Sequence, residues 1–322
     1  MLQEEILAID SDILCLQELD HYEDFWLPVL TNAAYQGCYR KRTGGKADGL
    51  GVFFKKNRWL SIHCIVSFKL EHESGIDFND DTGRGACFVT LRALGSAGND
   101  TSLTVACAHL DWKLGSNQKA QAEQLIAALT RFRQEKKPKA SSVRPIILCG
   151  DFNSEPNSVV YKYVRGDRPS LSGSTRSTTV TKASGKPLQT GEKRGKKKPT
   201  PSSQEDGETA EDNKAEETES LPGKSDTVTA SRGSVASSSR VQFESAHVVH
   251  SGREVEFTTY TTSRQCALDY IWLECNAQGT PLFTVDSVKA CPSAKELSSE
   301  KALPSSVFPS DHLSVCCSLS SQ

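Results

Sequence analysis

The stretch Ile146-Ile147-Leu148-Cys149-Gly150-Asp151-Phe152-Asn153-Ser154-Glu155-Pro156 decides the fold of this chain. A run of apolar residues leads into Gly150, and two polar side chains, Asp151 and Asn153, follow at once. A buried strand that ends in this way is typical of α/β proteins that place polar groups at the carboxyl edge of a sheet. At a spacing of two residues in extended chain, both side chains point to the same side. Gly-Asp and Asn-Ser are also ordinary turn residues, so the rest of the chain must decide between a site and a turn.

Length and charge leave the class of protein open. The chain has 322 residues, enough for one large domain or two ordinary ones. Its formal net charge is -2 and its pI is about 6.4. This balance is not that of a globally basic nucleic-acid-binding protein, so any binding of a polyanion must be local.

The cysteines indicate a reducing compartment. There are eleven, an odd number, scattered through apolar runs without any Cys-x-x-Cys pair. The chain does not begin with a signal peptide and holds no apolar run of membrane-spanning length. We therefore expect reduced thiols, no membrane partner and a cytoplasmic protein, with the nucleus also open.

Apolar periodicity predicts alternating helices and strands. A helix over 118–132 separates a strand over 103–110 from the opening stretch, in the βαβ manner. Residues 71–83, acidic and rich in Gly and Asn, are expected to form a loop. The other predicted helices are 1–9 and 20–30, and the other predicted strands are 13–16, 35–39, 49–54, 60–68, 87–94, 254–261, 267–273 and a final one after His312.

Further polar residues stand at the ends of predicted strands. Glu18 follows one strand, His109 closes another, Asp269 is the only charge in an apolar strand, and Asp311-His312 precedes the last. Singly, a strand-end Glu is as readily structural as functional, and a lone His after a strand is more often structural than catalytic. Together with Asp151 and Asn153, carboxylates and His without paired Cys or His ligands suit a hard divalent cation such as Mg²⁺ and phosphate-ester chemistry.

A basic loop, Arg40 to Lys46, follows the strand over 35–39. Lys41 and Lys46 are candidate substrate-binding residues because they would attract a phosphate. The other interpretation is a solvated hairpin loop.

Composition divides the chain into two ordered parts around an insertion. Between Val164 and Gln242 there is no aromatic residue, Cys or Ile. Such a stretch buries too little apolar area to offset its ordering entropy, so 165–245 is predicted to be a disordered insertion between 1–164 and 246–322, two parts of one domain. Its basic cluster, 193–198, is a nuclear-localisation or RNA-contact patch or simply a solvated linker.

Four motifs together resemble those of the endonuclease/exonuclease/phosphatase superfamily, in order and spacing once the insertion is removed. They are Leu-Gln-Glu (16–18), Gly-Asp-Phe-Asn-Ser-Glu-Pro (150–156), Leu-Asp-Tyr-Ile-Trp (268–272) and Ser-Asp-His (310–312). Cys-Leu-Gln-Glu-Leu-Asp-His-Tyr (15–22), Phe-Thr-Thr-Tyr (257–260) and Phe-Pro-Ser-Asp-His-Leu (308–313) are similar to the nocturnin and cytoplasmic deadenylase branch.

The resemblance implies a four-layer α/β sandwich, with two mixed β-sheets face to face and helices outside, that hydrolyses phosphoesters with Mg²⁺ or, as a substitute, Mn²⁺. Carried over by motif, the metal ligands are Glu18 and Asp311. The catalytic residues implied are Asp151 for the attacking water, Asn153 and His312 for the phosphate, Asp269 to hold His312, and His109 for the developing charge.

Two departures from the family pattern affect these expectations. The family's first strand, which carries an Asn at the metal site, has no counterpart before the helix over 1–9. We therefore expect an exposed Ile13 to Leu16 and a weakened metal site. Deadenylases carry an adenine-stacking aromatic shortly before Asp269, whereas this chain has Arg264. A guanidinium can stack on a base or bind an extra phosphate, so Arg264 is a third candidate substrate-binding residue.

The resemblance leaves two substrates open, an RNA 3′ end such as poly(A) and an adenine dinucleotide such as NADP. The alternative function is a truncated, weakly active or non-catalytic family member that binds RNA or other proteins. Hydrolysis of sphingomyelin or inositol phosphates is more distant.

Overall fold

The computed structural model describes residues 1–61, 64–94, 101–113, 116–135, 144–166 and 240–321. They belong to one compact unit. Residues 167–239, most of the predicted insertion, lie outside the described residues.

A seven-stranded sheet forms the centre of this unit, with the order β4-β5-β6-β7-β8-β12-β9. β7 and β8 are parallel and joined through α3, as the βαβ pattern predicts, and the other neighbours are antiparallel. The strands are β4 (Asn57–Ser61), β5 (Cys64–Asp77), β6 (Gly85–Leu94), β7 (Thr101–His109), β8 (Ile146–Asp151), β9 (Phe243–Ser245) and β12 (Asp269–Glu274).

A smaller antiparallel sheet faces it, with the order β1-β3-β2. Its strands are β1 (Ile13–Leu16), β2 (Tyr35–Lys41) and β3 (Gly49–Lys55), and three helical segments accompany it, α1 (Leu2–Ile9), the π-helical turn η1 (Tyr22–Trp26) and α2 (Leu27–Asn32). On β3, Val52 and Phe54 are fully buried because this strand is central and faces the large sheet.

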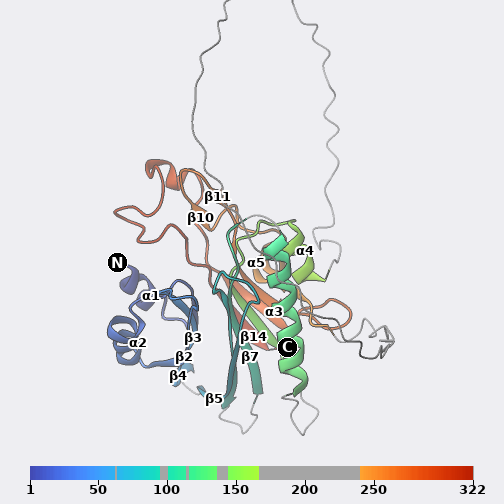
Figure 1. Ribbon diagram of the computed structural model, residues 1–322. Coiled ribbons are helices and arrows are strands. Elements are labelled where there is room, and N and C mark those ends of the chain that lie inside the picture. Colours follow the sequence, from blue (N-terminus) through green and yellow to red (C-terminus); the bar gives the residue numbers. More distant parts are fainter. Residues whose placement is uncertain (62–63, 95–100, 114–115, 136–143, 167–239, 322) are drawn as a thin grey trace, which may run out of the picture. The chain divides into compact units, whose positions relative to one another are not determined.

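Three apolar cores separate four layers, helix, sheet, sheet and helix (Figure 1). The first core joins α1 and α2 to the small sheet. The second, with Val52, Val89 and Val105, lies between the sheets. The third packs the large sheet against α3 (Ser116–Glu135) and α4 (Val159–Arg165). These layers confirm the predicted sandwich.

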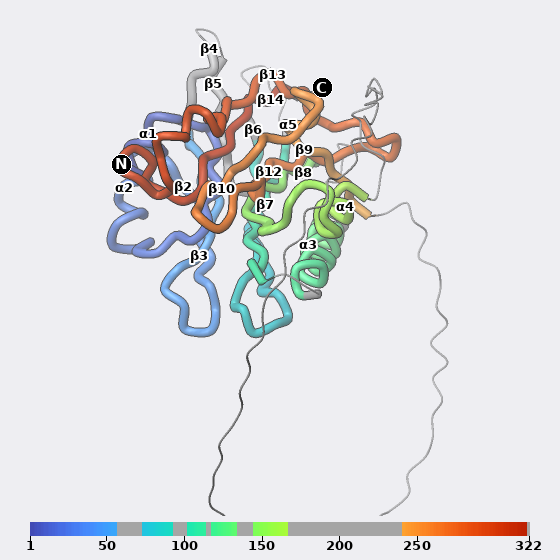
Figure 2. The backbone as a smooth tube through the Cα atoms, turned by 90° about the horizontal axis from the view of Figure 1, so that it is seen from above, coloured from blue at the N-terminus to red at the C-terminus, as the bar shows by residue number. Residues whose placement is uncertain are grey.

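The C-terminal part adds short elements around the end of the large sheet (Figure 2). The strands β13 (Phe283–Val288) and β14 (Cys317–Ser321) form an antiparallel pair that packs on Ile147 and Ile271. The remaining elements are α5 (Ala246–Ser251), β10 (Thr259–Tyr260), β11 (Gln265–Cys266) and the 3₁₀ turn η2 (Glu296–Ser299).

Some element boundaries differ from those predicted. Residues 71–77, expected in a loop, continue β5 because they pair with β6 along its length. Of the strand expected over 254–261, only β10 forms. The predicted insertion is also too long at both ends. Arg165 is the last residue of α4, and Phe243–Ser245 forms β9, paired with β12.

Two of the sequence predictions, the lack of a membrane-spanning segment and the reduced thiols, can be compared with the described residues. None of the helices that the structure describes is long and apolar enough to span a membrane. Every cysteine whose side chain is described is a free thiol.

Candidate active site

The end of β8 places Asp151 and Asn153. A side chain at Gly150 would put its Cβ atom 1.9 Å from the carbonyl oxygen of Ala108, so only glycine lets β8 lie this close to β7. The Asn153 main-chain N–H donates to Asp151 Oδ1 (2.7 Å), and its side-chain amide donates to Oδ2 (3.0 Å) and to the Leu110 carbonyl (3.0 Å). Asn153 has a left-handed φ of 48°. The opening stretch therefore forms a turn that also orients a buried carboxylate.

Asp151 is a buried anion. Burial alone would raise its pKa, but the hydrogen bond and charge of His109, followed by the charge of His312 and the Asn153 main-chain N–H, bring the pKa below its ordinary value. Asp151 Oδ2 lies 3.4 Å from His109 Nε2. The carboxylate is ionised at neutral pH and is able to accept a proton or hold a cation.

Asp269 and His312 form a dyad. Asp269, the first residue of β12, accepts hydrogen bonds through Oδ2 from His312 Nδ1 (2.7 Å) and from the Thr258 hydroxyl (2.5 Å). The Thr258 hydroxyl in turn accepts from the main-chain N–H groups of Leu268 and Asp269. Burial and the nearby Asp151 push the pKa of Asp269 upward, and its bonds to His312 and Thr258 oppose this.

The dyad keeps His312 protonated. Burial lowers the pKa of His312, but the hydrogen bond and charge of Asp269, reinforced by Asp151 and Asp311, raise it to about 9. An imidazolium at His312 therefore lies near the ionised carboxylate of Asp151 at neutral pH.

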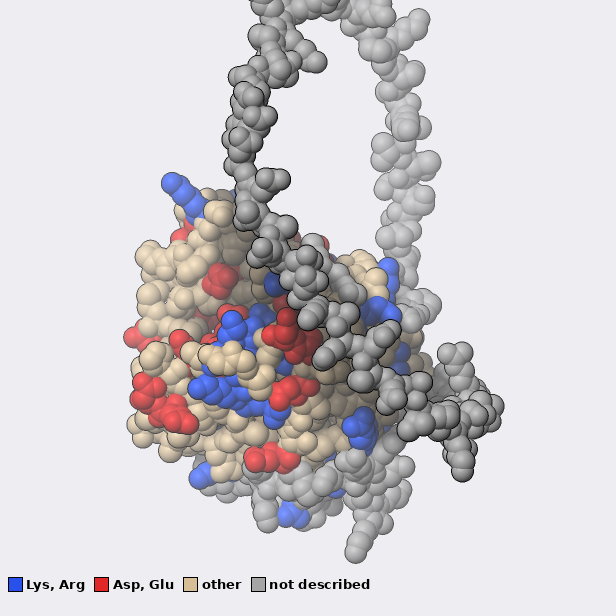
Figure 3. Space-filling view, viewed as in Figure 1, with Lys and Arg blue, Asp and Glu red and all other residues tan. Residues whose placement is uncertain are grey.

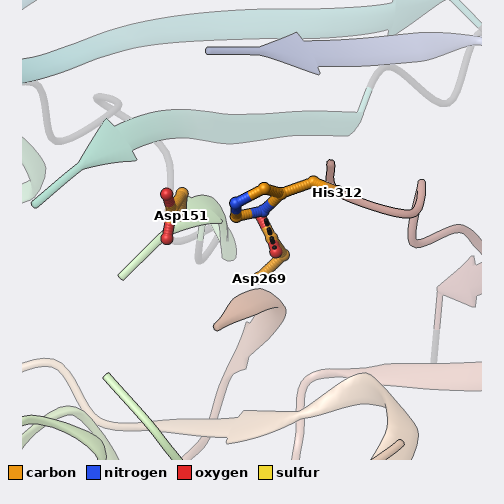
Figure 4. Close-up of side chains that lie close together, drawn as sticks. All are labelled: Asp151, Asp269 and His312. Carbon is orange, nitrogen blue, oxygen red and sulfur yellow. Dashed lines mark hydrogen bonds and ion pairs between the residues drawn. The ribbon is translucent and has the colours of Figure 1, made fainter. Parts of the chain in front are cut away.

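Asp151, Asp269 and His312 come together from three separate parts of the chain (Figure 4). They offer ligand atoms that all lie within 4.8 Å of one another, which makes them a group able to hold a metal ion. Because His312 carries a proton and donates to Asp269, Asp151 is the member of this group best able to bind a metal ion.

His109 lies beside this group at the end of β7 and is buried. Its Nε2 is 3.4 Å from Asp151 Oδ2 and 3.8 Å from Glu18 Oε1. The Glu18 side chain is 66% exposed, and the residue has a φ of 52° after β1. Two carboxylates thus flank one imidazole nitrogen, which brings Glu18 to the site as the motif predicts.

Arg264 reaches the site through Asn153. Its Nη2 donates to the Asn153 carbonyl oxygen (3.0 Å) and its Nη1 to Oδ1 (3.4 Å). Arg264 therefore places a cation against the turn that carries Asp151 and Asn153.

The remaining predicted residues lie further out. Asp311 is exposed and lines the same groove as Glu18, and it is not in the three-residue group. Lys41 is exposed and lines a small cavity together with Arg42, Arg84 and His109. Lys46 is exposed in the β2–β3 loop, and no contact joins it to the site within the described residues.

The face in Figure 3 gathers Lys and Arg side chains near its centre with carboxylates around them. Basic residues at the end of β2 follow this pattern, since Arg40 pairs with Asp77 (2.7 Å) and Arg42 with Asp48 (3.4 Å). These pairs neutralise part of the positive charge that was expected to attract a phosphate.

A groove of about 1420 Å³ opens beside the site. It runs between β1 and β14, over Val105 and Ile147 of the large sheet, and reaches Glu18 and Asp151. Within the described residues, β1 pairs only with β3, and β14 only with β13. The expected exposure of 13–16 is partial, because Leu14 is buried and its three neighbours are half-buried.

Three residues that shape the site could not be recognised from the sequence. Thr258 lies in the motif 257–260, but nothing in its spacing shows that its hydroxyl fixes Asp269. Gln118 donates to the carbonyls of both Asp111 (2.8 Å) and Asn153 (2.9 Å), although it appears only as a helix start in the sequence. Arg84 is buried 4.0 Å from Asp111, and no sequence signal marks that pair.

Comparison with known proteins indicates the family to which this chain belongs. A family model described as the Endonuclease/Exonuclease/phosphatase family matches residues 1–312. Protein angel homolog 2 of Danio rerio is 34% identical over 175 residues, which cover 52% of this chain and 29% of that protein. Nocturnin of Homo sapiens is 32% identical over 174 residues, covering 51% of this chain and 37% of nocturnin. The chain thus spans about a third of the length of these relatives.

Two solved structures share the fold. The human nocturnin catalytic domain with bound sulfate has a TM-score of 0.59 at 25% identity, and the alignment covers 100% of this chain and 85% of that one. ANGEL2, described as a 2′,3′-cyclic phosphatase, in complex with adenosine-2′,3′-vanadate, has a TM-score of 0.63 at 20% identity, covering 99% and 84%. The relatives confirm the nocturnin-like branch that the motifs predict.

Proposed function

Because the chain belongs to the endonuclease/exonuclease/phosphatase family, we propose that it is a metal-dependent phosphoesterase acting on an adenine-containing substrate, either an RNA 3′ end or a dinucleotide such as NADP. The observation that carries this proposal is the convergence of Asp151, Asp269 and His312 within 4.8 Å. An ionised carboxylate and an imidazolium in one site suit in-line displacement at phosphorus, which depends on positioning and charge neutralisation.

The proposed roles follow from the protonation states. Asp151, buried and ionised, orients the attacking water and accepts its proton. His312, held as an imidazolium by Asp269, donates to a phosphate oxygen and stabilises the charge that develops there. His109 is buried between Asp151 and Glu18 and keeps the Asp151 carboxylate in place.

Asn153 is proposed to act mainly through position. Its amide group already donates to Asp151 and Leu110. A phosphate contact from this amide, as the family motif implies, needs one of these bonds to be exchanged.

The residues present fit a hard divalent cation such as Mg²⁺. Glu18 and Asp151 would hold it, since they offer carboxylate oxygens on either side of His109 Nε2. Mg²⁺ takes one or two carboxylates and keeps several waters, so the exposed Glu18 is compatible with it. When bound, the cation supplies charge neutralisation at the phosphate. Asp311 stays a predicted ligand that supports the same position from the groove.

The test is hydrolysis by the full chain. Oligo(A), NADP and an adenosine 2′,3′-cyclic phosphate are each incubated with enzyme, with Mg²⁺, with Mn²⁺ and with EDTA. We expect turnover of at least one substrate that EDTA abolishes. Asp151→Asn should lower kcat by at least about 100-fold, as loss of a general base does, whereas Asp286→Asn, a carboxylate on β13, should not.

Two results oppose the proposal. Turnover that persists in EDTA would exclude the metal requirement. Wild-type protein that hydrolyses none of the three but binds oligo(A) would favour the alternative, a non-catalytic RNA-binding member. The cytoplasmic localisation stays a prediction, which imaging of the tagged full chain would check.

A further inference from the structure

Trp112 is an exposed indole just beyond the catalytic strand end. It follows His109 by three residues, and 59% of its surface is exposed. Among the aromatic side chains that the structure describes, Phe25 is the only other exposed one, at 44%. No described aromatic ring or cation packs against Trp112. Tryptophan carries a large apolar surface that folded chains usually bury, so this exposed indole, three residues along the chain from His109, is available to pack against a ligand.

The backbone that carries Trp112 is fixed to the site. The Asp111 N–H donates to Gln121 Oε1 (2.7 Å), and the Asp111 carbonyl accepts from Gln118 Nε2 (2.8 Å). Both glutamines are buried. The same Gln118 amide donates to the carbonyl of Asn153 (2.9 Å). The Gln118 side-chain amide therefore links Asp111 to the turn that carries Asp151. Trp112 is the next residue along the chain.

A cation stands at the same corner. The Asn153 carbonyl that accepts from Gln118 also accepts from Arg264 Nη2 (3.0 Å). Arg264 and the Gln118 amide that holds Asp111 therefore donate to one oxygen atom. A phosphate-bearing ligand that reaches this corner meets a guanidinium, and the exposed Trp112 is the residue that follows Asp111.

We propose that Trp112 is the nucleobase platform of the site, on which the base of a nucleotidyl substrate stacks while its phosphate lies by His312. This inference rests on the proposed function and narrows its substrate to phosphoesters that carry a base next to the scissile phosphate. Sphingomyelin and inositol phosphates have no such base. Stacking contributes about 1–3 kcal/mol per base and tolerates every base, so it gives affinity without strict sequence preference.

The first test measures binding without turnover. In EDTA, AMP should quench part of the tryptophan emission of wild-type protein, and ribose 5-phosphate, which has the phosphate but no base, should not. Trp112→Phe should lose this quenching. The described alternatives, Trp26 and Trp272, are 6% and 0% exposed and out of reach of a ligand. Equal quenching in Trp112→Phe, or by ribose 5-phosphate, would overturn the inference.

The second test uses matched substrates. An oligoribonucleotide ending in adenosine is compared with the same chain ending in an abasic ribose. Trp112→Ala should raise KM for the first by about 5- to 150-fold, the equivalent of 1–3 kcal/mol, and leave the abasic substrate within about twofold. Trp112→Phe should restore most of the loss, because it keeps an aromatic face. Phe25→Ala, which removes the other exposed aromatic, should change neither.

The outcomes separate the two proposals. Loss of activity on both substrates in Trp112→Ala would mean a structural role and sink the platform. Wild-type protein that hydrolyses neither substrate but shows base-specific quenching would refute the proposed function and support the platform.

Discussion

At the scale of single residues, the site depends on protonation states that neighbours impose. His312 is an imidazolium at neutral pH only because Asp269 accepts from its Nδ1, and Asp269 is fixed by the Thr258 hydroxyl. Asp151 is a carboxylate because His109 and Asn153 outweigh its burial. Each of these two proposed catalytic groups therefore depends on neighbouring side chains that set its protonation state.

Asp269→Asn should shift the alkaline limb of the kcat–pH profile to lower pH. The pKa of His312 is about 9 in the folded protein against an ordinary 6.5, so its proton is bound more tightly in the folded state. This contribution to stability is full below pH 6.5 and is lost as the pH rises through 9. Without Asp269 the pKa should fall towards its ordinary value, and activity at pH 8 should drop by at least about tenfold.

NMR titration of the His312 ring and a kcat–pH profile check this prediction. Asp311→Asn is the matched control, because Asp311 is the last and smallest of the named contributions to the pKa of His312. The pKa of His312 should fall less in Asp311→Asn than in Asp269→Asn. An unchanged His312 titration in Asp269→Asn would contradict the assignment of the dyad.

At the scale of elements, the close approach of β7 and β8 brings His109 and Asp151 together, since they are paired residues in the register of these strands. Gly150 permits this approach with a φ of 149° and no room for a Cβ atom beside the Ala108 carbonyl. The close packing of these two strands therefore also builds the candidate site.

Gly150→Ala should destabilise the fold by more than about 2 kcal/mol, because the substitution adds a backbone clash to the conformational cost of an unfavourable φ. Gly252→Ala is the control. Gly252 also has a positive φ, of 72°, but open space surrounds its Cβ position, so this variant should show only the conformational cost of about 1–2 kcal/mol. Urea unfolding measures both. A Gly150→Ala protein no less stable than Gly252→Ala would show that the two strands can separate without cost.

At the scale of the whole molecule, the two described ends that flank 167–239 lie together. Arg165 donates to Glu244 through Nε (2.9 Å) and Nη2 (2.7 Å), and both side chains are buried. The guanidinium of Arg240 lies 3.6 Å from the centre of the Tyr163 ring. These contacts join α4 to the start of β9 across a long interval of sequence.

Replacing 167–239 by a short Gly-Ser linker should leave the fold and the proposed activity intact. The linker closes a loop about ten times shorter, and each doubling of loop length costs about 0.6 kcal/mol, so the free energy of unfolding should rise by up to about 2 kcal/mol. Thermal unfolding and the hydrolysis assay measure this on the shortened chain. A fall in both would mean that the replaced residues contribute to the core or the site.

The sequence by itself determined the class of fold and most of the site. Apolar periodicity located the β7–α3–β8 unit, because burial imposes its pattern on local sequence. The motifs identified Glu18, Asp151, Asp269 and His312, and the end of a predicted strand identified His109. The structure brings all five to one place. Polar residues directly after apolar strands carry this signal, since strand ends meet at a sheet edge.

Only the tertiary structure decided which of these residues touch and what charge each carries. The raised pKa of His312 needs Asp269, 43 residues away, and the anchoring of Trp112 needs the contact between Gln118 and Asn153. It also decided that Arg165 and Glu244 belong to the core. In the sequence both residues resemble the charged linker beside them, and they are buried because they form an ion pair with each other. Contacts between distant residues depend on the packing of layers, and local sequence does not encode that packing.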